Sequence, residues 1–413
     1  MYSSCIRLYP AVKANVGNRL IVFGNSLSDI GNLFTQPLTN GVQWWMGRFS
    51  NGPVWNEYLA KWSGSTLINY AYGGATSNNT GIELFDNIKI TVPDAYKQIG
   101  MFNSTFHGLF SKAVLSNDIA AIEIGGNDVL DGLSGLSSGA VDLDTYSSSI
   151  ASSIGSSISR LTDMGYKRIL VSNIPDISSS ARAFTFPAPL RQQLVTFITA
   201  INTKTQVFIS QFTQNKGLDL EYIRVLDFFG LVYQLQNPIV SAAMGLKNTT
   251  SPCSVTNTDG SLISACTDSS KYAFMDDIHP TTKVHALVGA AARSILLDEK
   301  FTITTDSVLG LISAYKIDDI STSNNPLFIA DSFTTGVTNV PSYKVVRSAH
   351  DAAAIARVAN EVAAAYASAW QSPTYEGALL STTSSPVYIT GPSKIPAYST
   401  IRFSSYIRLG CRA

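Results

Sequence analysis

Between residue 19 and about residue 297, the sequence alternates short apolar runs with longer segments of helical character. The apolar runs are rich in branched residues and bounded by Gly, Asn or Asp, which predicts buried strands at 19–24, 118–125, 167–174 and 221–228. The intervening segments predict helices near 104–116, 143–164, 189–214 and 282–297. Strands separated by helices indicate a parallel sheet covered on both faces, with functional residues at the carboxyl ends of its strands.

The character of the sequence changes near residue 300, where we place a domain boundary. Before it, the Ser/Gly-rich stretch 131–157 is expected to form an exposed loop that leads into a helix. After it, FTITTDSVLGLISAYKI and NPLFIADSFTT have strand-like composition, and 350–370 is predicted to form an Ala-rich amphipathic helix. We therefore expect an N-terminal extension at 1–18, the main domain at 19–299, and a C-terminal extension of unknown role at 300–413.

Composition narrows the class of protein. Hydrophobic residues make up 45% of the 413 residues, which is enough to bury a large core. The 29 Lys and Arg residues balance the 29 Asp and Glu residues, so no overall field attracts nucleic acid. No run of about 18 apolar residues occurs, so a membrane-spanning helix is not expected.

Features of the sequence give conflicting indications of the cellular compartment in which the protein resides. Residues 1–20 lack the apolar stretch of a secretory signal, and their basic composition is compatible with an organelle transit peptide or a misassigned start. Charged residues are only 14% of the chain, and three glycosylation sequons begin at Asn78, Asn103 and Asn248. Both features favour a secreted glycoprotein.

Four cysteines occur, at positions 5, 253, 266 and 411. Cys253 and Cys266 enclose a polar loop and are predicted to close it with a disulfide in an oxidising compartment, unless they are two unrelated thiols. The four histidines show no paired spacing for a metal, and we expect His285 to be structural and no metal or cofactor to be needed.

Two short motifs carry residues suited to acyl transfer. Ser26 lies in FGNSLSDIGN, directly after the first predicted strand, where a sharp turn exposes a hydroxyl group. Asp276 precedes His279 by three residues in DDIHP, a spacing that lets the carboxylate hold one imidazole nitrogen while the other faces a nucleophile. We expect Ser26 to attack, His279 to act as general base, and Asp276 to fix the tautomer.

These motifs and two others resemble the GDSL or SGNH hydrolase family of lipases and esterases. NYAYGGATS (69–77) resembles the second family block and IGGNDVL (124–130) the third, so all four blocks occur in family order. The resemblance implies a three-layer α/β/α, flavodoxin-like fold over 19–297. It also implies ester hydrolysis through an acyl-enzyme, with an oxyanion hole formed by Ser26, Gly74 and Asn127. The segment RFSNGPVWNEYLA (48–60) is similar to fungal and bacterial phospholipases, hemolysins and acetylesterases.

One residue departs from the family pattern, because Asn25 stands where the family has its namesake aspartate. We expect Asn25 to weaken activity modestly by removing a negative charge. Asp277 competes with Asp276 for the role of triad acid. The G-x-S-x-G sequence at 135–139 has no strand before it and is interpreted as a chance match to a nucleophile elbow.

Other classes of function remain open. The domain could be a vestigial hydrolase that serves as an accessory subunit and binds a protein partner through 300–413. A cluster of aromatic residues after the nucleophile could line an acyl or sugar pocket, as in a lectin-like binder, or could pack in the core; its members are Trp44, Trp45, Phe49 and Trp55. The expected substrate is a small-molecule or lipid ester.

Overall fold

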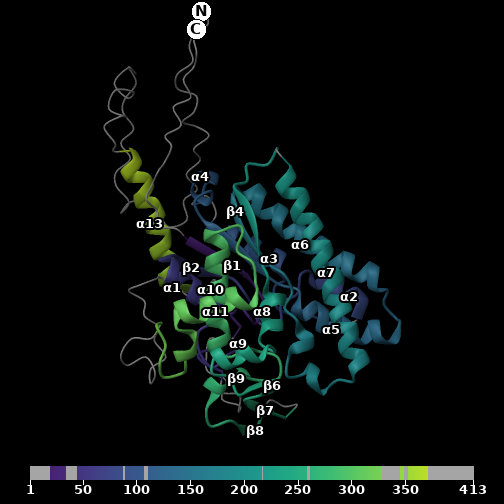
Figure 1. Ribbon diagram of the computed structural model, residues 1–413. Coiled ribbons are helices and arrows are strands. Elements are labelled where there is room, and N and C mark those ends of the chain that lie inside the picture. Colours follow the sequence, from purple (N-terminus) through teal and green to yellow (C-terminus); the bar gives the residue numbers. More distant parts are fainter. Residues whose placement is uncertain are drawn as a thin grey trace, which may run out of the picture.

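The computed structural model describes residues 19–33, 44–86, 89–106, 110–215, 217–257, 261–327, 345–347 and 352–370. A sheet lies at its centre with helices packed around it (Figure 1). The sheet has six strands in the order β10-β2-β1-β3-β4-β5, and every neighbouring pair is parallel. The strands are β1 (Arg19–Gly24), β2 (Thr66–Asn69), β3 (Ile119–Glu123), β4 (Arg168–Ser172), β5 (Tyr222–Leu226) and β10 (Val345–Arg347). The four predicted strands are thus confirmed.

Successive side chains of β1 enter two separate cores, as the pleat of a strand requires. Leu20 and Val22 contribute to one core, and Ile21 and Phe23 to the other. The first core packs against α1 (Trp55–Ser63), α8 (Phe228–Gln234), α9 (Pro238–Ala243), α10 (Thr282–Leu297) and α11 (Thr305–Tyr315). The second packs against α2 (Asn79–Asp86), α3 (Ala95–Thr105), α5 (Gly126–Ser138), α6 (Leu143–Met164) and α7 (Ala188–Gln214). The expected three-layer α/β/α arrangement is confirmed.

Smaller elements lie beside the sheet. Strand β6 (Asn248–Pro252) pairs with β9 (Tyr272–Phe274), and β7 (Ser254–Thr256) pairs with β8 (Leu262–Ala265) as a hairpin. Cys253 and Cys266 form the predicted disulfide at the base of this hairpin. Short helices complete the described part at α4 (Lys112–Leu115), η1 (Ile177–Ser179), η2 (Ala183–Thr185), η3 (Ser269–Lys271) and η4 (Ile317–Asp319).

Two local predictions before residue 300 were wrong, and strand β2 of the central sheet was missed. The segment 131–157 is not an exposed loop, because α5 covers 126–138 and α6 begins at Leu143. At least one of its glycines is required by helix packing. Gly132 lies against the Tyr146 ring, where a Cβ atom would collide with it. Near 104–116, the chain instead ends α3 at Thr105 and forms the short α4. The strand β2, only four residues long, was not predicted.

The strand-like sequence FTITTDSVLGLISAYKI forms the helix α11 instead of a strand. The Thr304 hydroxyl oxygen caps its N-terminus by accepting a hydrogen bond from the Ser307 N–H group, and the Thr304 N–H group in turn donates to the Ser307 hydroxyl oxygen. Val308, Leu311 and Ile312 are buried at a helical spacing. The cap and this spacing outweigh the preference of its β-branched residues for strands.

Parts of 300–413 pack on the same core as the preceding residues. The Asn325 amide donates a hydrogen bond to the Tyr58 hydroxyl at 2.6 Å, and Leu327 is fully buried. Strand β10 adds to the sheet beside β2, and α13 (Ala352–Trp370), which confirms the predicted helix, places Val358 in the second core. The division near residue 300 remains a prediction, and the structure shows packed contacts across it. The expected extension 1–18 and most of the strand-like NPLFIADSFTT lie outside the described residues.

Within the residues that the structure describes, no helix is both long and apolar enough to cross a membrane.

Candidate active site

The turn that carries Ser26 follows β1 directly and is fixed by its own backbone. The carbonyl group of Asn25 accepts hydrogen bonds from the N–H groups of Ser28 (3.1 Å) and Asp29 (3.0 Å), so the chain reverses sharply. Before the turn, the Gln98 side chain bonds both the N–H (2.8 Å) and the carbonyl (2.9 Å) of Gly24. Ser26 is left 8% exposed at the carboxyl end of β1.

Asp29 ties this turn to the loop that contains Gly74. Its carboxylate accepts N–H groups from the turn itself, at Gly31, Asn32 and Leu33. It also accepts the N–H group of Gly73 at 2.8 Å. Burial raises the pKa of Asp29, while these backbone hydrogen bonds act in the opposite direction. The first and second sequence blocks are therefore joined through one buried side chain.

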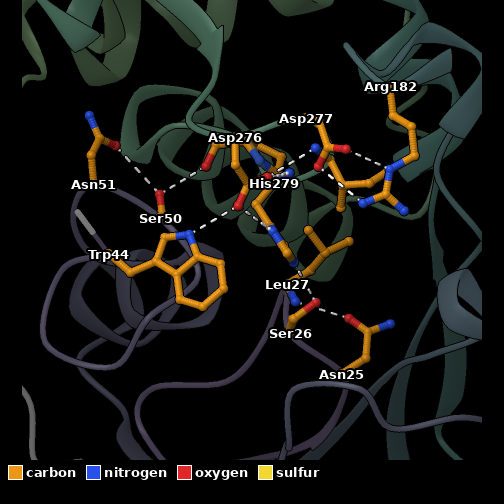
Figure 2. A network of polar contacts seen from close by, with 12 residues as sticks. Asn25, Ser26, Leu27, Trp44, Ser50, Asn51, Arg182, Asp276, Asp277 and His279 are labelled. Atoms are coloured by element: carbon orange, nitrogen blue, oxygen red, sulfur yellow. Dashed lines mark hydrogen bonds and ion pairs between the residues drawn. The ribbon is translucent and has the colours of Figure 1, made fainter. Parts of the chain in front are cut away.

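Ser26, His279 and Asp276 form a continuous hydrogen-bonded series (Figure 2). The Ser26 Oγ atom lies 2.8 Å from Nε2 of His279, and Nδ1 of the same ring lies 2.8 Å from Oδ2 of Asp276. The serine and the histidine are 253 positions apart in the chain, so only the sheet topology brings them together. This geometry is the one that a serine nucleophile and its general base require.

Asp276 is almost fully buried and accepts four hydrogen bonds. Its Oδ1 atom receives the N–H groups of Ile278 (2.9 Å) and His279 (2.7 Å). Its Oδ2 atom receives the His279 ring and the indole Nε1–H of Trp44, the latter at 2.9 Å. Burial alone would raise the pKa of Asp276, but the charge interaction with His279 and these hydrogen bonds lower it overall. The carboxylate is therefore kept ionised.

Asp277 points away from His279. It forms a bidentate ion pair with Arg182, at 2.7 Å and 3.1 Å, near the surface (Figure 2). Of the two candidate acids, the structure brings Asp276 to the histidine.

The aromatic cluster divides into two groups. Trp44 and Phe49 contact the His279 ring, with ring centroids 5.8 Å and 5.0 Å away. Trp45 instead stacks under the Arg48 guanidinium, and Trp55 is buried in the core. Phe49 also fills the space above Gly73, where any Cβ atom would collide with its ring. The cluster thus lies partly around the histidine and partly in the core.

Gly74 and Asn127 lie on neighbouring segments beside the nucleophile turn. Gly74 is exposed and has a φ angle of +79°, a conformation that favours glycine. Asn127 lies in the first turn of α5, and its side-chain amide donates to the Ala75 carbonyl at 2.8 Å, which leaves its second hydrogen available. Asp128 accepts the N–H and hydroxyl groups of Ser77, and so fastens α5 to the Gly74 loop.

A cavity opens beside Ser26, between the nucleophile turn and the first turn of α5. Its wall is mainly apolar, and its apolar lining side chains are Leu27, Leu130, Ile177, Phe228, Val232, Phe274 and Ile278. Asn127 and Asp176 supply polar groups at its edge. Such a cavity suits the hydrocarbon part of a small ligand.

Three other motifs noted in the sequence lie outside this arrangement. Ser137 of the G-x-S-x-G match lies on α5 and bonds the carbonyl of Leu133 within its own helix. His285 is fully buried in α10, and burial lowers its pKa to about 3. Among the described residues, no group of three or more His, Cys, Asp or Glu side chains is arranged to hold a metal ion.

Sequence reasoning missed three residues that surround the site. Asp29 lies within FGNSLSDIGN without a predicted role, and no pattern predicts the hydrogen bond from Trp44 to Asp276. Glu123 lies outside the motifs that predict the site. Glu123 ends β3 and is buried directly behind the nucleophile turn. A charged residue at the end of an otherwise apolar strand was the one available signal, since charges are rarely buried without a partner.

Comparison with known proteins identifies the family. A family model described as GDSL-like Lipase/Acylhydrolase matches residues 20–292. The chain belongs to this family. The matched region contains the sheet strands β1 to β5, the Ser26 turn and the Asp276–His279 loop. The proteins similar to this chain include one named as a GDSL esterase/lipase.

Individual relatives are distant in sequence. Thermolabile hemolysin of Vibrio parahaemolyticus is 28% identical over 284 residues, 66% of this chain and 62% of the relative. Phosphatidylcholine-sterol acyltransferase of Aeromonas hydrophila is 28% identical over 171 residues, 40% of this chain and 47% of the relative. A GDSL esterase/lipase of Arabidopsis thaliana is 28% identical over 186 residues, 38% of this chain and 50% of the relative. The chain thus spans between 47% and 62% of the length of these relatives.

Proposed function

We propose that this protein is a serine hydrolase that cleaves carboxylic esters through an acyl-enzyme intermediate. The observation that carries the proposal is the unbroken series from Ser26 through His279 to Asp276, with 2.8 Å at each side-chain contact. Membership of the GDSL-like lipase/acylhydrolase family supports it. The substrate would be a small-molecule or lipid ester.

The proposed reaction proceeds in two half-reactions. As Ser26 Oγ attacks the ester carbonyl carbon, its proton passes to Nε2 of His279, and Asp276 stabilises the imidazolium. The tetrahedral intermediate then collapses, the C–O bond to the alcohol breaks, and His279 donates the proton to the departing alkoxide. Water attacks the acyl-enzyme in the same manner and releases the carboxylic acid.

The negative charge on the tetrahedral intermediate needs donors that are in place beforehand. The Ser26 N–H, the exposed Gly74 N–H and the Asn127 side-chain amide would supply them. Asp29 and Asp128 hold the Gly74 loop from two sides, so these donors cost little reorganisation during the reaction. The apolar cavity beside Ser26 would receive the acyl or alcohol part of the ester.

The test is hydrolysis of p-nitrophenyl acetate and octanoate by the purified protein and by Ser26→Ala. We expect turnover that falls in the variant by about 10⁴-fold or more. Ser137→Ala is the matched control, because it removes the decoy serine on α5 and should retain full activity. An organophosphonate probe should label wild type and Ser137→Ala and leave Ser26→Ala unlabelled.

Either of two results would refute the proposal. One is full activity of Ser26→Ala. The other is the absence of both turnover and labelling in a folded wild-type protein, which would favour an accessory subunit that binds a partner through 300–413.

A further inference from the structure

A buried polar group lies against the turn that carries Ser26. The carboxyl group of Glu123, at the end of β3, is 1% exposed. Its Oε1 atom accepts the side-chain N–H of Asn25 at 3.1 Å, and its Oε2 atom accepts the hydroxyl of Ser28 at 2.7 Å. Glu123 therefore holds residues on both sides of Ser26.

Asn25 uses both ends of its amide group in this arrangement. While its nitrogen donates to Glu123, its Oδ1 atom accepts the N–H group of Leu27 at 2.9 Å. The amide thus connects β3 to the residue that follows the nucleophile. Asn25 itself is 2% exposed and lies beside Ser26 in Figure 2.

The donor at position 25 matters because no described lysine or arginine side chain forms an ion pair with Glu123. Burial raises the pKa of Glu123 to about 7, against the lowering effects of the hydrogen bonds from Ser28 and Asn25 and of the charge of His279. An aspartate at position 25 would replace one of these donors with a second carboxylate about 3 Å away, and two such groups cannot both ionise cheaply.

We propose that Asn25 and Glu123 form a matched donor–acceptor pair that positions Ser26, so that the aspartate typical of the family is the wrong residue for this chain. The inference rests on the proposed hydrolase function for its kinetic consequence. It reverses the sequence-based expectation that Asn25 weakens activity. Asn25 and Glu123 are positioning residues, because they act on the ester only through the Ser26 turn.

The test exchanges the two functional groups. Asn25→Asp places two carboxyl groups together, and Glu123→Gln removes the acceptor charge. The double variant restores a complementary pair, because the new amide at position 123 can donate to the new carboxylate at position 25, which still accepts the Leu27 N–H group. We expect Asn25→Asp to lower kcat by about 10- to 100-fold with little change in KM, because small displacements of a nucleophile have effects of that size. The double variant should recover to within about 3-fold of wild type.

A second pair provides the matched control. Asn173, just after β4, also donates to a carboxylate, Asp227, at 2.8 Å and accepts a backbone N–H, that of Phe229, at 2.8 Å. Asn173→Asp therefore creates the same kind of carboxyl pair between residues that are not part of the Ser26 turn. It should lower the melting temperature and leave kcat unchanged within about 3-fold.

Melting temperatures test the inference even if no ester is hydrolysed. Asn25→Asp should lower the melting temperature by roughly 4 °C or more, and the double variant should regain at least half of that loss. The inference is overturned if Asn25→Asp is as active and as stable as wild type, or if the double variant is no better than Asn25→Asp. A wild type that lacks turnover while the melting temperatures still show rescue would refute the proposed function and keep the pairing.

Discussion

Two buried carboxyl groups flank Ser26, and their pKa values are shifted in opposite directions although both groups are removed from water. Asp276 accepts four hydrogen bonds and faces an imidazole that can become charged, and its pKa is lowered. Glu123 accepts two hydrogen bonds from neutral side chains, and its pKa is raised to about 7. Because both groups are buried, the comparison teaches that their partners account for the difference: those around Asp276 outweigh the effect of burial on its pKa, and those around Glu123 do not.

Replacing Asp276 by Asn should have the largest effect on activity of the changes considered. The amide retains the shape of the carboxylate but cannot stabilise the imidazolium, so kcat should fall by about 10⁴-fold. Ester hydrolysis measured beside Asp277→Asn provides the control, because Asp277 pairs with Arg182 at the surface and that variant should retain most activity. A larger loss in Asp277→Asn than in Asp276→Asn would reassign the triad acid.

The pH dependence of stability should separate Glu123 from Asp276. The pKa of Glu123 is about 7 in the folded protein against an ordinary value of 4.5. The folded state therefore binds this proton more tightly, and the resulting stability is fully present below 4.5 and lost as the pH rises through about 7. Relative to Glu123→Gln, wild type should lose on the order of 2–3 kcal/mol of unfolding free energy between pH 5 and 8.

Urea unfolding of wild type and Glu123→Gln at pH 5, 6.5 and 8 measures this difference. Parallel pH profiles for the two proteins would contradict it and would mean that Glu123 titrates alike in the folded and unfolded states.

Removing one hydrogen-bond donor from Asp276 should raise the pKa of that carboxyl group, so that it becomes more like Glu123. Trp44→Phe keeps an aromatic ring against His279 but deletes the indole N–H that reaches Asp276 at 2.9 Å. Because a hydrogen bond to a charged group contributes about 1.5–3 kcal/mol, we expect kcat to fall by about 10-fold. Trp62→Phe is the control, since Trp62 packs against Tyr58 and Tyr315 on α1 and α11. Equal effects in both variants would make the Trp44 contribution one of packing alone.

The sequence predicted the architecture where periodicity was strong and failed where packing decided. Strand β1 and helices α6 and α10 were found at their observed bounds, because each is long or continuously apolar. Helix α5 was missed because its glycines and serines resemble a loop, and only the Tyr146 ring explains Gly132. Helix α11 was misread as a strand because its capping pair was not recognised.

The candidate site was predictable only in the residues that carry motifs. Ser26, Gly74, Asn127 and the Asp276–His279 pair were named from short patterns, and the structure brings the serine, histidine and aspartate together. Trp44 lies 232 positions from Asp276, and Glu123 lies 98 positions from Asn25. No local pattern encodes such pairs, because their distance is set by the crossover connections of the sheet.

Strand β10 bears on how this protein can be shortened. It occupies the outer side of β2, so that β2 is an inner strand of the sheet. A chain cut at residue 299 would lose β10 and leave the β2 hydrogen-bonding groups open to strands of other molecules. It would also lose Leu327 from the core and Asn325 from the Tyr58 hydroxyl. Expression designs that follow the end of the family match, at residue 292, would therefore produce a shorter chain that self-associates.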